Sequence, residues 1–335
     1  MKKRFFLSIL ILNVSLGLFA GRYAGDFMVI GAGVRASGMG GAFAAVADDG
    51  SAIYWNPSGI AQMRNTEIGI MRAFLYQGLA AYDNFTFCQP LPNEVTIGLN
   101  WTRLTIDDIP VFLERHLVHN VDYRSSFHEF NLTAVPDGHI TSTDDILQFA
   151  FAKHIHYDLN LGWLFFDLPF DLYFGGNIKY IKREIDENRG TGTGFDFSFL
   201  SKTSLAVLFE QDWLGDVAFG INFQDVGGTT ITWDVESNHE DEVLFNSKLG
   251  VAVRQPLKFI RSSFTLSTDI DYIYGKTRHY GFEFLYQKIL GFRLGYYDTN
   301  FSTGLSVSFY DFTVDYAFVT NVLANTNRIG LKINF

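Results

Sequence analysis

The sequence predicts an all-β protein, an integral antiparallel β-barrel of about fourteen strands in a bacterial outer membrane. Three observations support this prediction. Aromatic residues make up 16% of the 335 residues, with 34 Phe and 16 Tyr, and such residues favour strands over helices. Segments that alternate polar and apolar side chains recur along the chain, so each would have one apolar and one polar face. The chain also ends on an aromatic residue that closes such a segment.

Residues 1–20 are predicted to be a cleaved signal peptide. Residues 2–4 are basic, and a short apolar core follows that ends at Ala20. This core is shorter than the ~20 residues that a spanning helix needs. We therefore expect cleavage after Ala20 rather than retention of a membrane anchor.

Charge and cysteine content narrow the class of protein further. The formal net charge is −10, and loss of the basic signal peptide makes it more negative. Binding to nucleic acid requires a basic surface, so nucleic acid is not an expected partner. Cys88 is the only cysteine, which excludes an intrachain disulfide.

Residues 25–63 are rich in glycine and alanine and lack the strand alternation. Such a stretch is too apolar for a solvated tail and too rich in glycine for a pair of strands. We predict that a domain spanning residues 21–64 forms a plug, or hatch, inside the lumen of the barrel. The residues expected to shape it are Gly31, Gly33, Gly38, Gly40, Gly41, Asp48, Asp49, Asn56 and Pro57.

Each type of residue in this plug has a physical role. Glycine allows tight turns, positive φ and close backbone contact. Pro57 fixes its own φ and biases Asn56 towards an extended conformation. The Asn56 amide can in addition hydrogen-bond nearby backbone and close a polar gap.

The same region contains Gly31-Ala32-Gly33 and, three residues later, Ala36, which matches the GxGxxA fingerprint of dinucleotide-binding proteins. That chemistry needs a helix immediately afterwards and a second strand that ends in an acidic residue. Ser37-Gly38-Met39-Gly40-Gly41 follows instead. We therefore interpret the glycines as positions of close backbone packing.

The barrel itself is predicted to comprise residues 65–335. Its alternating segments are about ten residues long, the length that a tilted strand needs to cross a membrane. Residues 157–168 could be strand extensions or a short hairpin. The fourteen segments are centred near residues 70, 84, 98, 150, 177, 197, 220, 249, 268, 282, 294, 305, 315 and 331.

The connections between these segments alternate in length. Short connections are expected in the periplasm at 89–93, 287–289 and 310–311, and long ones outside the cell at about 104–144, 184–193 and 226–242. This asymmetry is typical of outer-membrane barrels. A soluble β-sandwich would show the same strand alternation, but it has no reason to alternate its loops in this way.

Charged residues on the polar faces are expected to line the lumen and to pair across it. A catalytic pair could be chosen from any such set, but mixed structural pairing is the simpler interpretation. The acidic members are Asp269, Asp271, Glu283, Asp311 and Asp315, and the basic ones are Lys179, Lys248, Arg254, Arg293 and Arg328.

Two histidine pairs have the spacing of metal ligands. His154 and His156 share a strand face, and His116 and His119 would lie one helical turn apart. Neither pair has a third ligand nearby, as a zinc site requires. No grouping of serine, histidine and aspartate has supporting context. We expect no metal, no cofactor and no catalytic residue, and a protein that is not an enzyme.

Both ends of the mature chain resemble a known family. The run IGAGVRASGMGGAFAAVADDGSAIYWNPSGIAQM, residues 30–63, resembles the N-terminus of the PorV/PorQ family of outer-membrane proteins. Its core, ADDGSAIYWNPSG, is similar to the plug signature of the wider FadL-like barrels, although Ser58 stands where alanine is usual. LANTNRIGLKINF, residues 323–335, resembles the closing strand of that family, and Phe335 resembles its outer-membrane assembly signal.

The resemblance implies two functions. FadL-like relatives pass fatty acids or other hydrophobic molecules, so the first expectation is passage of a fatty-acid-like small molecule across the outer membrane. PorV-like relatives serve the type IX secretion system, so the alternative is a component that docks exported cargo at the cell surface. The long outer loop after residue 104 departs from the family pattern and bears on cargo specificity. The expected partners are outer-membrane lipid, the outer-membrane assembly machinery, and either a hydrophobic ligand or secretion proteins and their cargo.

Overall fold

The computed structural model describes residues 25–112, 136–160, 162, 167–235, 239–273 and 275–335. The predicted signal peptide, residues 1–20, lies outside these ranges. No helix among the described residues is long and apolar enough to cross a bilayer.

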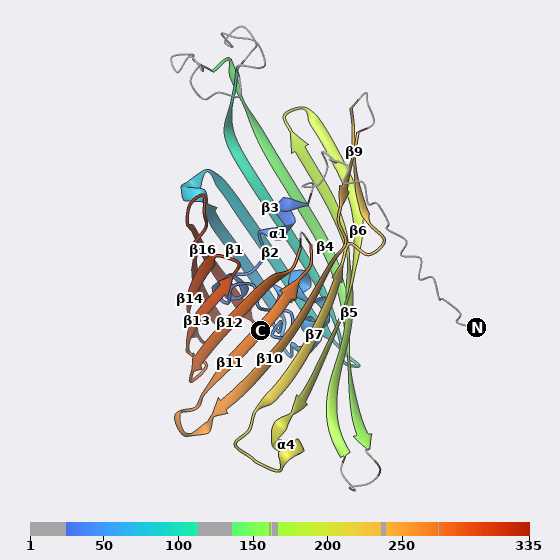
Figure 1. The fold of residues 1–335 in the computed structure, drawn as a ribbon, viewed down its shortest axis with the longest axis vertical. Coiled ribbons are helices and arrows are strands. Elements are labelled where there is room, and N and C mark those ends of the chain that lie inside the picture. Colours follow the sequence, from blue (N-terminus) through green and yellow to red (C-terminus); the bar gives the residue numbers. More distant parts are fainter. Residues whose placement is uncertain (1–24, 113–135, 161, 163–166, 236–238, 274) are drawn as a thin grey trace, which may run out of the picture.

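Fourteen antiparallel strands form a closed barrel, as the alternation predicts (Figure 1). The ring closes where the first strand pairs with the last, with Ile70 opposite Leu331. Every predicted centre falls within one of these strands. They are β1 (Glu67–Leu75), β2 (Ala80–Leu91), β3 (Val95–Val111), β4 (Gly138–Asn160), β5 (Asp167–Ile185), β6 (Asn188–Ser204), β7 (Asp216–Gln224), β10 (Asn246–Leu257), β11 (Ser262–Asp271), β12 (Thr277–Tyr286), β13 (Leu290–Tyr297), β14 (Asn300–Phe309), β15 (Phe312–Val319) and β16 (Thr326–Asn334).

The outer face of the barrel is apolar, as a membrane protein requires. On β4, Phe149 and Phe151 point outward and are 53% and 52% exposed, whereas Ala150 between them is fully buried. A closed ladder leaves no strand edge unpaired, so its backbone polar groups are satisfied without water. An apolar exterior on such a ladder is the architecture of a transmembrane barrel.

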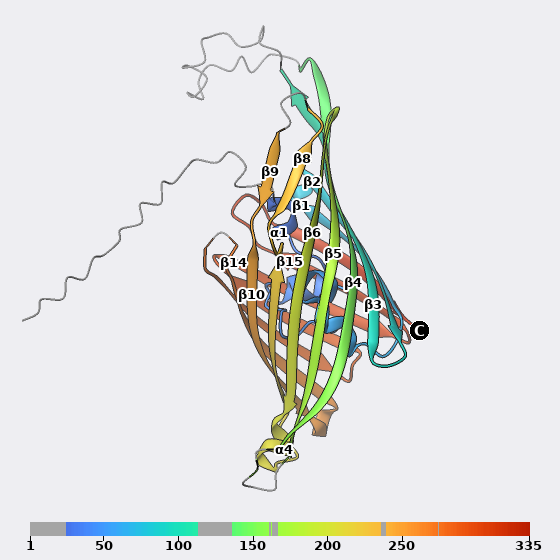
Figure 2. The same ribbon diagram turned by 90° about the vertical axis from the view of Figure 1, so that its right-hand side faces the viewer.

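Strands β3–β6 are 17 to 23 residues long, so the expected length of about ten residues is wrong there. Strands β4 and β5 run past the shorter strands at both ends of the barrel (Figures 1 and 2). Residues 157–160 and 167–168 extend them on one side. Beyond the bilayer both faces of a strand are wet, so the polar alternation fades although the hydrogen-bonded ladder continues.

Two of the expected long outer loops are consequently much shorter. The β5–β6 connection consists of Asp186 and Glu187 alone, where a loop over 184–193 was expected. The β3–β4 connection spans 112–137 rather than 104–144, and much of it lies outside the described residues. The third expected loop contains a hairpin of β8 (Thr229–Trp233) and β9 (Glu240–Val243), and β8 pairs with the start of β6.

Residues 25–63, here called the N-terminal segment, lie inside the barrel (Figures 1 and 2). The segment contains four short helices and leads directly into β1. Its α2 packs against β13–β16 and its η1 against β3–β6, so it reaches opposite sides of the wall. The helices are α1 (Asp26–Val29), α2 (Val34–Gly38), α3 (Ala52–Trp55) and the 3-10 helix η1 (Pro57–Gln62).

Insertion of the barrel into the outer membrane should depend on where along the outward face of a strand a charge is introduced. Phe149→Arg, midway along β4, places a cation among lipid tails at a cost of about 2–4 kcal/mol. We expect reduced levels in the outer-membrane fraction and loss of heat-modifiable migration on gels. His139→Arg is the matched control, because His139 lies on the same strand, with its side chain 48% exposed, near the end of the β3–β4 hairpin. Equal membrane levels of the two variants would contradict the assigned lipid face.

Candidate functional site

The predicted glycines lie where the N-terminal segment bends and touches the wall. Gly31, Gly33, Gly40 and Gly41 all have positive φ, whereas Gly38 does not. At Gly40, with φ +64°, a Cβ atom would lie 2.7 Å from the backbone nitrogen of Tyr296 on β13. At Gly38 it would lie 3.1 Å from Cα of Gly304 on β14. Side chains here would push the segment away from the barrel wall.

Arg35 is the main charged contact between the N-terminal segment and the wall. Its Nε and Nη2 donate to the two carboxylate oxygens of Glu283 on β12, each at 2.8 Å. It also pairs with Asp48 and lies 3.7 Å from Asp49 within the segment. Bidentate arginine–carboxylate pairs fix both distance and orientation. The two predicted aspartates are therefore joined to the wall through one guanidinium.

Charged residues of the wall extend this network from Glu283 back to Asp49 of the N-terminal segment. Arg293 on β13 binds Glu283 at 2.7 Å and Asp315 on β15 at 3.0 Å. Lys332 on β16 lies 3.4 Å from Asp315 and 3.1 Å from Asp49. We call this closed set the ion-pair ring; its members are Arg35, Asp49, Glu283, Arg293, Asp315 and Lys332.

Charge compensation explains how so many ions can be buried together. Burial alone would raise the pKa of the Asp49 carboxyl, but Lys332 and Arg35 beside it hold that pKa below its usual range. Loss of one member leaves its partners as uncompensated buried charges, which is more costly than the intact pair is favourable. The alternation in the sequence predicts that Glu283, Arg293 and Asp315 face inward. It carries no signal that they meet Arg35.

Asn56 and Pro57 form a second point of attachment, on the opposite side of the lumen. Asn56 is extended, with φ −164° and ψ 90°, and Pro57 begins η1. The Asn56 amide donates to the carbonyl of Ala44 at 2.6 Å and to that of Phe199 on β6 at 3.3 Å. Its oxygen accepts from the Ser58 hydroxyl at 2.6 Å. The Ser58 hydroxyl, which the usual alanine lacks, thus satisfies the side-chain oxygen of Asn56.

Inward polar side chains of the strands bind the backbone of the segment. Asp269 on β11 accepts from the amides of Phe43 and Ala44 at 2.8 and 2.7 Å. Asn177, Asn222 and Gln224 donate to the carbonyls of consecutive residues in α3, Ile53, Trp55 and Tyr54 respectively, at 3.0–3.1 Å. The polar faces of these strands therefore hold the backbone of the N-terminal segment in place, in addition to the backbone hydrogen bonds within the segment itself.

A cavity of about 220 Å³ lies between the N-terminal segment and strands β10–β16. We call it the outer cavity, because the β11–β12 and β13–β14 connections that border it lie at the same end of the antiparallel barrel as the β3–β4 and β5–β6 connections, which are predicted outside the cell. Trp55 and Ile30 of the segment line it, together with His279, Tyr297 and Arg328 of the wall. The Arg328 guanidinium donates to the carbonyls of Gly31 and Ile30 at 2.7 and 2.8 Å.

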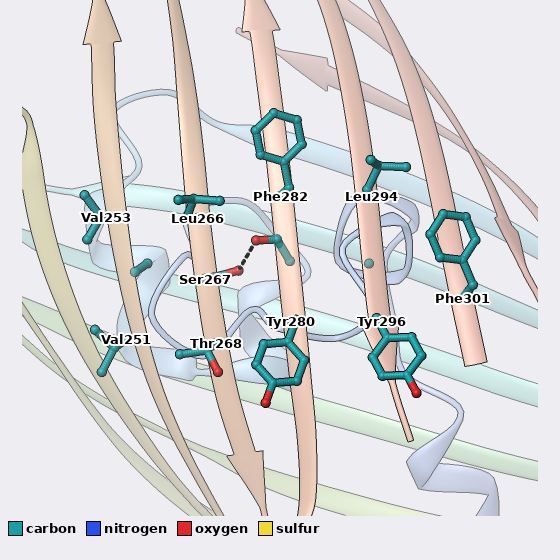
Figure 3. A pocket seen from close by; sticks show the side chains of 13 residues that line it. Val251, Val253, Leu266, Ser267, Thr268, Tyr280, Phe282, Leu294, Tyr296 and Phe301 are labelled. Carbon is teal, nitrogen blue, oxygen red and sulfur yellow. Dashed lines mark hydrogen bonds between the residues drawn. The ribbon is translucent and has the colours of Figure 1, made fainter. Parts of the chain in front are cut away.

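A larger apolar groove of about 570 Å³ lies on the lipid-facing side of β10–β14. Figure 3 shows its aromatic and aliphatic walls, including Tyr280, Phe282 and Tyr296. Paired glycines, Gly281 and Gly295, form part of its floor. A Cβ at either would lie within 3 Å of the segment backbone at Met39 or Gly40. Only a layer of backbone separates the groove from the N-terminal segment there.

Phe335, His154 and His156 belong neither to the ion-pair ring nor to the lining of the outer cavity. Phe335 follows β16, is 64% exposed, and exchanges two backbone hydrogen bonds with Thr66. His154 binds Glu94 and Asp171 at 2.9 Å each, and His156 binds Asp171 at 3.0 Å. The second histidine pair, residues 116 and 119, falls outside the described residues.

No protein-family model and no curated protein matches the sequence. Among solved structures, the CymD monoaromatic hydrocarbon channel aligns with a TM-score of 0.53 and 10% identity, over 91% of this chain and 98% of that one. A TodX deltaS2S3 mutant monoaromatic hydrocarbon channel aligns with a TM-score of 0.50 and 9% identity over the same shares of the two chains. The Ralstonia pickettii toluene transporter TbuX gives 0.49 and 12%, again over 91% and 98%.

At identities this low, the likeness to the first two structures shows the fold alone. That fold is a closed antiparallel β-barrel, in agreement with the barrel predicted from the sequence. The closed ladder and its apolar exterior are the architecture of outer-membrane proteins. The chain is a multi-pass β-barrel of the bacterial outer membrane.

The ion-pair ring should contribute measurably to stability. Glu283 is 1% exposed and joins both Arg35 and Arg293. Glu283→Gln should lower the free energy of unfolding in detergent by about 3–5 kcal/mol, because two guanidinium groups lose their shared counter-ion. Glu184→Gln is the control, since it removes an acid from the partly exposed Lys182–Glu184 pair, and exposed pairs contribute little. Equal denaturation midpoints for the two variants would contradict the structural role of the ring.

Proposed function

We propose that this barrel passes a small hydrophobic molecule across the outer membrane and that the N-terminal segment is its plug. The observation that carries the proposal is the fixation of this segment across the lumen. The ion-pair ring holds it to β12–β16, and Asn56 holds it to β6. Because these attachments are discrete polar contacts, they can be exchanged one at a time when the plug moves.

The outer cavity supports passage rather than closure alone. Its lining combines the aromatic ring of Trp55 and the apolar side chains of Ile30 and Val319 with a few polar groups. Small-molecule sites are mostly apolar with a small number of placed polar groups. CymD and the TodX variant are monoaromatic hydrocarbon channels, and a ligand of similar chemistry fits this lining. A fatty-acid-like ligand is what the FadL-like motif implies.

Removal of the plug tests the proposal. Deletion of residues 30–47 removes Arg35 and the glycine contacts while leaving every strand in place. We expect a barrel that inserts but conducts ions in planar bilayers well above the wild-type level. Deletion of residues 230–242 in the β8–β9 hairpin is the control, because that hairpin lies outside the closed ring of strands. Normal insertion with unchanged conductance of the plug deletion would show that the segment does not close the lumen.

A second function is supported by the PorV/PorQ-like residues at both ends of the chain and by the tall wall of β3–β6. With the β8–β9 hairpin, that wall offers a surface beyond the membrane on which exported cargo could dock. In a strain that lacks this protein, the secretion role predicts unattached cargo with normal uptake of hydrophobic molecules. The transport role predicts the reverse.

A further inference from the structure

Arg328 on β16 differs from the other buried cations of the lumen. Lys179 pairs with Asp196 and Asp225, Lys248 with Asp271, and Arg293 with Glu283 and Asp315. Arg328 is only 6% exposed, yet it forms no ion pair with any carboxylate of the described residues. The sequence led us to expect that it would pair across the lumen like the others, and in the described structure it does not.

The contacts that Arg328 does make leave it short of partners. A guanidinium has five N–H donors and no acceptor. Two of these donors bind the carbonyls of Gly31 and Ile30, and Nε has no hydrogen-bond partner. Carbonyl dipoles satisfy individual donors but do not neutralise the positive charge. A buried charge without a counter-ion is costly, so an anion that reaches Arg328 should bind there favourably.

The outer cavity gives such an anion a place. Arg328 lines it together with Trp55, Tyr297 and Val319. The other charged groups on its lining are mostly engaged. Lys248 is held by Asp271, and His279 Nδ1 lies 2.7 Å from the carbonyl of Gly40, with its ring stacked on Tyr297.

Asp298, at the β13–β14 turn, also lines the cavity and is an acid. It forms no ion pair with Arg328 in the described chain. Arg328 is consequently the one cation on this lining that lacks a carboxylate, among the residues that the structure describes. Its surroundings pair a positive group with aromatic and aliphatic side chains in one small space.

We propose that the outer cavity binds a small carboxylate with an apolar body, whose carboxylate contacts Arg328 and whose body rests on Trp55 and Val319. This inference rests on the proposed transport function and names the chemical class of its substrate. At about 220 Å³, the cavity is smaller than the ~300–1,000 Å³ of sites for drug-sized ligands. A single aromatic ring or a short aliphatic chain is therefore the size that fits.

Benzoate and benzyl alcohol form a matched pair of probes, because they share a ring and differ in charge. With the full mature barrel in nanodiscs, titration calorimetry should show benzoate binding at least roughly tenfold more tightly than benzyl alcohol, as expected for a charge-assisted contact. Arg328→Gln should remove this preference by weakening benzoate alone. Arg328→Lys should keep part of it, since it retains the charge without the planar fork.

Because Arg328 also holds the N-terminal segment, each variant is checked for wild-type conductance and heat-modifiable migration. Equal affinity of the two probes for the wild type would overturn the proposal. It would also be overturned if Arg328→Gln weakened both probes alike, because the residue would then act only on the segment. Entry of benzyl alcohol into proteoliposomes tests the proposed function separately. If benzyl alcohol passes but benzoate does not bind more tightly, the inference about Arg328 is wrong and the transport function is retained. If neither probe passes, the transport function itself is contradicted.

Discussion

Closure of the strand ladder between β1 and β16 is the constraint from which the rest of the structure follows. In lipid every backbone polar group needs an internal partner, and pairing Ile70 with Leu331 removes the last free edge. Once the ring is closed, strand alternation sends one set of side chains to lipid and the other to a confined lumen. That inner set includes many polar groups, and each of them needs a partner as well.

The N-terminal segment supplies those partners, so the wall and the segment satisfy each other. Asp269 meets the amides of Phe43 and Ala44, and the amide side chains of β5 and β7 meet the carbonyls of α3. The ion-pair ring adds directed charge contacts, and the positive-φ glycines let the backbone approach the wall closely. A closed barrel thereby becomes one with a filled lumen. Under the proposed transport function, a ligand exchanges these polar contacts as it passes.

The sequence predicts the wall far better than its contents. The alternation of polar and apolar residues with a period of two is a local signal. It locates all fourteen barrel strands and also the turn at residues 287–289 between β12 and β13. It fails where that signal fades, in the wet extensions of β4 and β5. The ring pairs residues as distant as Arg35 and Glu283, and no local pattern encodes such a contact. The lumen positions also mislead: Asn100 alternates like a water-facing residue, but it is fully buried and bound to Asn84 and Gln148.

The central claim is that the N-terminal segment closes the lumen at rest. Thiol labelling from the aqueous phase tests it most directly, in a Cys88→Ser background that carries one new cysteine. Ala44→Cys lies at a fully buried position, and Val29→Cys, at a position 42% exposed, is the reference. We predict rapid labelling at position 29 and protection at position 44 in the intact barrel. Labelling of both positions at the same rate would mean that water already passes the segment, and it would contradict the account.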